Sequence, residues 1–151
     1  MPVLKSKVIN YSQATGPVVT DAYPCSASVA FKNLGGKFVT LDANERLALT
    51  VAGDTRVLGW AFVGEVTTNA TAGVDFVVVN TSREAKYWMP ASGAVTRDLV
   101  GKLCDIRVSS GIQQAAIALS TEDTLKIYDV DIANTLVLVG IYDTAAPAGV
   151  I

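Results

Sequence analysis

Two apolar runs on either side of a turn-rich break, within residues 57–90, constrain this chain more than any other feature. In residues 57–64 the alternate side chains Leu58, Trp60 and Phe62 are large, and most of those between them are small. Neighbouring side chains of a strand point to opposite faces, so this pattern predicts one bulky, aromatic face and one small face. A strand that is apolar on both faces must be covered on both, by another sheet or another subunit.

The second run, residues 74–79, is apolar apart from Asp75. Residues 67–73 between the two runs are rich in turn formers and end in Gly73, where a positive φ costs least. The pattern predicts two core strands joined by a surface loop. We expect Trp60 to be buried rather than to serve as a ligand platform, because it lies within an apolar run.

Short alternating segments at regular spacing predict an all-β fold, a small β-sandwich or a barrel-like domain. Residues 112–119 also fit one face of a helix, but turns on both sides of them favour a strand. A helical turn is expected near residues 96–100. The other expected strands are residues 38–41, 47–51, 85–89, 103–108, 125–131 and 135–142.

Residues 1–37 differ from the rest, because they hold three prolines and no sustained period. A disordered terminus is one interpretation. Tyr11, Tyr23 and Phe31 are costly to leave in water, so we favour an extended N-terminal arm that becomes ordered against a partner. The expected organisation is an arm (1–37), a β-rich core domain (38–143) and an extended tail (144–151).

Composition indicates that part of the surface is hidden against other chains. Hydrophobic residues make up 50% of the chain and charged residues 17%, below the ~25% typical of soluble domains. No apolar run reaches the ~20 residues that span a bilayer, and residues 1–12 have no secretory apolar region, so neither membrane insertion nor secretion is expected. A disulfide between Cys25 and Cys104 is not expected without a secretory context, and Cys104 fits a small core position.

Few residues suggest chemistry. The sequence has no histidine, which removes Ser-His-Asp and Cys-His sites, and it has no phosphate-binding glycine loop. Asp129 and Asp131 could share a strand face and hold a cation, but a solvated face is the favoured interpretation. The net charge of −2 gives no general case for nucleic-acid binding. We therefore expect a non-enzymatic protein without cofactor or metal.

Other polar and aromatic residues have simpler explanations than ligand binding. Asn69 and Asn80 begin glycosylation-like triplets, but without a secretory signal they are expected to bond their own backbone in turns. Tyr87 and Trp88 could stack on a base or a sugar. Because they are adjacent in a strand they face opposite ways, and core packing or an interface is the favoured role.

The segments LGWAFVG (58–64), AGVDFVVV (72–79) and YWMP (87–90) resemble those of small β-rich head decoration, or cement, proteins of tailed phages. The resemblance covers about residues 38–143 in style. It implies a homotrimer on the outer capsid surface that clamps subunits of the major capsid protein, made in the host cytoplasm. It implies no enzymatic site and transfers no individual residue role.

Two alternatives to a decoration protein remain open. One is another phage structural part, such as a tail or minor capsid protein. The other is a carbohydrate-binding β-sandwich module that uses Trp60 or Trp88 as a stacking platform.

The two ends of the chain carry opposite charge. Residues 1–41 hold four lysines and one acidic residue, whereas residues 120–151 hold five acidic residues and one lysine. This asymmetry suggests that the arm reaches the acidic region of a neighbour or of the capsid. Apolar strand faces in residues 57–79 or 135–142 are expected to contribute to the trimer. The candidate interface residues are Lys5, Lys7, Tyr11, Tyr23, Phe31, Val77 and Val139.

Overall fold

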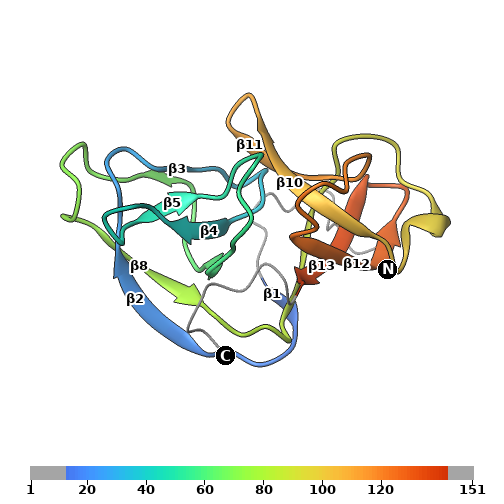
Figure 1. The fold of residues 1–151 in the computed structure, drawn as a ribbon, viewed down its shortest axis with the longest axis horizontal. Coiled ribbons are helices and arrows are strands. Elements are labelled where there is room, and N and C mark those ends of the chain that lie inside the picture. Colours follow the sequence, from blue (N-terminus) through green and yellow to red (C-terminus); the bar gives the residue numbers. More distant parts are fainter. Residues whose placement is uncertain (1–12, 143–151) are drawn as a thin grey trace, which may run out of the picture.

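The computed structural model describes residues 13–142, which form thirteen strands and one short 3-10 helix (Figure 1). The all-β prediction is confirmed, and no α-helix occurs in this part of the chain. Two larger antiparallel sheets and a small two-stranded sheet make up the fold. Figure 1 shows two halves, with β2, β4, β5 and β8 in one and β10–β13 in the other.

The first half is a five-stranded sheet in the order β2-β8-β6-β4-β5. A parallel bridge between Cys25, just after β2, and Leu47, at the start of β5, joins the two outer strands, so the sheet closes into a small barrel. We call it the first barrel. Its strands are β2 (Thr20–Pro24), β4 (Phe38–Leu41), β5 (Leu47–Leu49), β6 (Gly59–Ala61) and β8 (Phe76–Asn80).

The second half has the strand order β9-β13-β12-β10-β11, and a parallel bridge between Ala91 and Ala115 closes it in the same way. We call it the second barrel. β10 and β11 form a hairpin whose turn residues Ser110 and Gly111 both have positive φ, as such tight turns require. The strands are β9 (Lys86–Pro90), β10 (Leu103–Ser109), β11 (Ile112–Ala116), β12 (Leu125–Asp131) and β13 (Leu136–Ile141).

The two barrels have the same topology. Numbered 1 to 5 in chain order within each barrel, the strands lie side by side in the same order, 1-5-4-2-3, in both. All neighbouring strands are antiparallel, and one parallel bridge closes each barrel. The bridging residue directly follows a proline in both, Pro24 and Pro90. The N–H of the next serine, Ser26 or Ser92, donates to the carbonyl across the bridge. The chain is thus a tandem structural repeat, which the sequence analysis did not predict.

Alternate side chains of the strands fill each barrel, and equivalent positions are occupied by similar residues. Val77 and Val79 on β8 point into the first barrel, and Val137 and Val139 on β13 occupy the matching places in the second. Small to medium apolar side chains suit the narrow interior of a five-stranded barrel.

The remaining elements extend this frame. β1 (Gln13–Thr15) pairs with β9, and β3 (Ala30–Phe31) pairs with β7 (Val66–Thr67). The side chain of Phe31 packs in the core of the first barrel. The expected helical turn is present as the 3-10 helix η2 (Arg97–Leu99).

Residues 13–37, the described part of the expected arm, belong largely to the fold. β2 lies within residues 1–37, yet it pairs with β8 over five residues and forms one wall of the first barrel. No strand is predicted here from the sequence, because Pro24 and the exposed Thr20 and Asp21 interrupt the apolar alternation. Residues 1–12 and 143–151, with Lys5, Lys7 and Tyr11, lie outside the described residues.

Candidate binding surface

Three aromatic rings join the two barrels, and they are packed too tightly to form a ligand platform. Trp60, on β6 of the first barrel, stacks on Tyr87 of the second with centroids 4.4 Å apart and planes 6° apart. Phe38 packs edge-to-face against both, with its ring centroid 4.8 Å from that of Trp60 and 5.5 Å from that of Tyr87. All three side chains are fully buried, which confirms the prediction for Trp60.

The prediction that Leu58, Trp60 and Phe62 form one bulky, packed face is wrong for Leu58, which lies on the other face, and for Phe62, which shares the face of Trp60 but is 36% exposed. Leu58 packs in the first barrel, whereas Trp60 packs against the second. The strand begins only at Gly59, so alternation does not extend back to Leu58. Gly59 is required here, because a Cβ at this position would lie 2.1 Å from the carbonyl oxygen of Asn80.

The two cysteines are buried and free, and Cys104 lies in the core of the second barrel as expected. Burial, with smaller effects from Asp105 and Asp123, raises the pKa of the Cys104 thiol to about 12. Burial, with a smaller effect from Asp75, also raises the pKa of Cys25. Both thiols are therefore neutral at physiological pH, and neither is poised as a nucleophile.

The acidic residues considered as cation ligands serve the backbone instead. Asp129 and Asp131 pair in regular register with Leu138 and Leu136, beyond a β-bulge between Ile127 and Asp129, so they share one face of β12 as expected. Asp131 accepts hydrogen bonds from Asn134, and Asp129 lies 3.5 Å from Arg97. No group of three potential metal ligands occurs in residues 13–142.

One buried carboxylate that the sequence analysis did not single out also has a structural role. Asp105 accepts the backbone N–H groups of Thr121, Glu122 and Asp123 at 2.9–3.1 Å, which fixes the loop between β11 and β12. Asn69 and Asn80 likewise accept N–H groups of their own turns, from Thr71 and Ser82, as predicted.

The first barrel carries an exposed apolar surface, which we call the first outer face. Its members are Phe62, Phe76 and Val78, which are 36%, 63% and 42% exposed. Val78 lies between Phe62, whose N–H donates to the Val78 carbonyl, and Ala22 on β2. The face lies on the same side of the sheet as Trp60, beyond the part that the second barrel covers.

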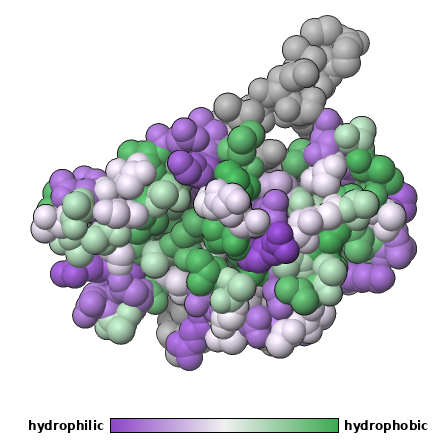
Figure 2. Space-filling model, turned by 90° about the horizontal axis from the view of Figure 1, so that it is seen from above, coloured by the Kyte–Doolittle hydropathy of each residue, from purple (hydrophilic) through white to green (hydrophobic). Residues whose placement is uncertain are grey.

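The second barrel has a matching surface, the second outer face, formed by Trp88, Leu138 and Tyr128. Trp88 and Leu138 are cross-strand partners, and Tyr128 is 41% exposed. The ammonium groups of Lys86 and Lys126 lie 4.6 and 5.6 Å from the centroid of the Tyr128 ring. Figure 2 shows hydrophobic residues at the surface of both halves of the molecule.

The predicted interface residues fall mostly behind these faces. Phe31, Val77 and Val139 are buried within the single chain, and Tyr23 packs partly against the first core. The strands that hold Val77 and Val139 exist as predicted, but both side chains point into the barrels, because a closed barrel buries one set of alternate side chains. The outward set includes Val78, which is exposed, and Leu138, which is half-buried, and sequence alternation alone could not separate this set from the buried one.

The comparisons with known proteins add no family to this description. No protein-family model matches the chain, and neither does any curated protein. In residues 13–142, no helix is long and apolar enough to cross a membrane.

Proposed function

We propose that this chain is a non-enzymatic structural protein of a virion. It binds the outer surface of a phage head as a homotrimer and stabilises contacts between subunits of the major capsid protein. The observation that carries the proposal is the first outer face, an apolar surface that residues 13–142 leave exposed. Such surfaces on small soluble proteins mark sites of protein association. The resemblance of residues 58–90 to decoration proteins implies that the partner is the major capsid protein.

The proposal is tested by co-sedimentation with purified heads that lack a decoration protein. The wild-type chain should pellet with the heads in a saturable manner and raise the temperature at which they rupture. Phe76→Asp should weaken binding at least tenfold, because the charge would be desolvated in the contacts that assemble the trimer on the head. Leu119→Asp, a change at an exposed apolar residue outside both faces, should bind as the wild type does.

A carbohydrate-binding module is the second candidate. The buried Trp60 cannot serve it, but Trp88 remains partly exposed beside Tyr128 and two lysines. The same sedimentation assay with insoluble polysaccharides separates the candidates. Binding to polysaccharide that is lost in Trp88→Ala, together with no binding to heads, would replace the capsid proposal.

A further inference from the structure

The two outer faces occupy equivalent positions in the repeat. Phe62 directly follows the fourth strand of the first barrel and Val78 lies on the fifth, whereas Tyr128 and Leu138 lie on the fourth and fifth strands of the second. Ala22 and Trp88 lie across from Val78 and Leu138 on the first strand of each barrel. One molecule therefore presents two related apolar faces.

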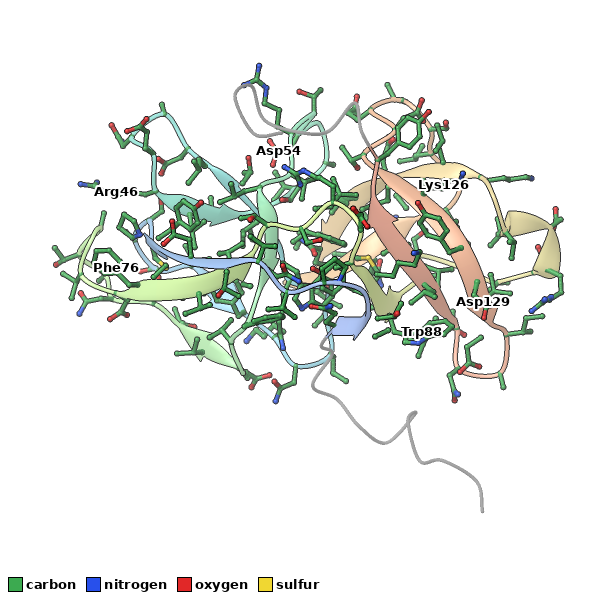
Figure 3. The ribbon with its side chains drawn as sticks, turned by 90° about the horizontal axis from the view of Figure 1, so that it is seen from below. Arg46, Asp54, Phe76, Trp88, Lys126 and Asp129 are labelled. Atoms are coloured by element: carbon green, nitrogen blue, oxygen red, sulfur yellow. The ribbon has the colours of Figure 1, made fainter. Side chains whose placement is uncertain are left out.

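The two faces lie in different halves of the molecule. In Figure 3, Phe76 lies at one end, and Trp88 and Lys126 lie in the opposite half. A single copy can therefore use both faces at once, each toward a different neighbour.

The two faces differ in shape at one equivalent position. In the first barrel this position is Asn80, whose buried side chain bonds Gln13 and the backbone of Pro17 and Val19. In the second barrel it is Gly140, over which the Tyr128 ring packs, because a Cβ there would lie 3.1 Å from that ring. A surface hollow beside Tyr128 is lined by Arg83, Glu84 and Lys86, among others. The first face projects phenylalanine rings, and the second face offers a recess.

The two faces also differ in charge. β2, β6 and β8 contain no lysine or arginine, whereas on the second face Lys86 and Lys126 flank Tyr128. Asp129 lies across from Leu138 on this face and pairs with Arg97. Pairing two second faces would bring four lysines together, and like charges in a contact are unfavourable. A phenylalanine ring placed among these lysines instead offers its π face to the ammonium groups.

We propose that the first outer face of one copy packs on the second outer face of the next copy, so that chains associate head to tail. Such a heterologous contact either closes into a ring or extends as a chain. An aromatic side chain of the first face covers the hollow beside Tyr128, and Val78 meets the apolar Trp88 and Leu138. The proposal rests on the self-association part of the proposed function and not on capsid binding, which the sedimentation assay measures separately.

Size-exclusion chromatography with light scattering tests the proposal on the full chain. The wild type should have a mass that is a multiple of 15.8 kDa. Phe76→Asp removes the first face and Tyr128→Glu removes the second, so each variant alone should be monomeric. Mixed in equal amounts they should form a discrete pair of twice the chain mass, because each retains the face that the other lacks. Leu119→Asp should keep the wild-type mass.

Circular dichroism checks that each variant is folded. If Phe76→Asp does not fold, Val78→Asp takes its place, and Leu138→Asp takes the place of an unfolded Tyr128→Glu. A monomeric wild type at the highest soluble concentration would overturn the proposal. So would a mixture of the two variants that contains monomers alone. A Tyr128→Glu variant that stays dimeric, with no new species on mixing, would show that first faces pair with one another, and would also overturn it.

Discussion

Trp60 belongs to the first barrel by its backbone and to the second by its side chain. Its ring points away from the first barrel and stacks on Tyr87, and Phe38 packs against both rings in edge-to-face geometry. Aromatic pairs in such stacked and edge-to-face arrangements contribute about 0.5–1.5 kcal/mol each beyond the area they bury. At the scale of single residues, these three rings pack the two repeats against each other.

Truncation of Trp60 to Ala should lower the free energy of unfolding by about 3–5 kcal/mol, because it leaves a large cavity between the barrels. Chemical denaturation measures this loss, and Trp88→Ala, a change at a partly exposed tryptophan, is the matched control. In a Trp88→Phe background the fluorescence of Trp60 should resist aqueous quenchers. Ready quenching, or a loss below ~1 kcal/mol, would contradict the packing described.

At the scale of elements, β8 shows how one strand serves two purposes. Val77 and Val79 point into the first barrel, whereas Phe76 and Val78 point outward and contribute to the first outer face. β13 repeats this division with Val137 and Val139 inside and Leu138 outside. The alternation that gives the barrel its core also gives each half of the molecule its apolar surface.

Two neighbouring substitutions on β8 should therefore have opposite results. Val77→Asp would place an unpaired charge inside the first barrel and should unfold the chain, and Val139→Asp should do the same in the second. Val78→Asp should leave the far-ultraviolet circular dichroism unchanged and the melting temperature within a few degrees of the wild type. If Val77→Asp melted as the wild type does, β8 would have to face the other way.

At the scale of the whole molecule, the chain is two like barrels in tandem that share one packed junction. β2 supplies the wall that closes the first barrel, since it pairs with β8 and bridges to Leu47 through Cys25. The segment expected to be a separable arm is thus divided. Residues 20–31 contribute strands to the fold, and residues 1–12 lie outside the described part.

Two deletions distinguish these parts of the arm. Removal of residues 2–12 should leave thermal stability close to that of the full chain, since no strand of the described fold is lost. Removal of residues 2–30 also deletes β2, and it should abolish the cooperative melting transition of the first barrel. A fully stable protein after the longer deletion would show that β2 is dispensable, as the sequence alone had suggested.

The sequence by itself determined where most strands lie. Alternation placed Phe38–Leu41 and Leu125–Asp131 at their observed bounds, and two flanking turns correctly favoured a strand for Ile112–Ala116 over a helix. These features are local, because strand period and turn chemistry depend on residues close together in the chain. Alternation did not predict β2, because its outward residues, such as Thr20 and Ala22, are polar or small.

Tertiary structure alone decided which side of each strand is the inside, and that the fold is a repeat. Traces of the repeat exist in the sequence, since Pro24-Cys25-Ser26 matches Pro90-Ala91-Ser92 and Gly36-Lys37 matches Gly101-Lys102 at nearly the same separation. Such short matches occur often by chance, so they identify a repeat only once the ladders align them. Val77 and Val78 have the same side chain. What distinguishes them is the closure of the sheet by a bridge between residues distant in the chain, Cys25 and Leu47, which encloses one face and leaves the other in water.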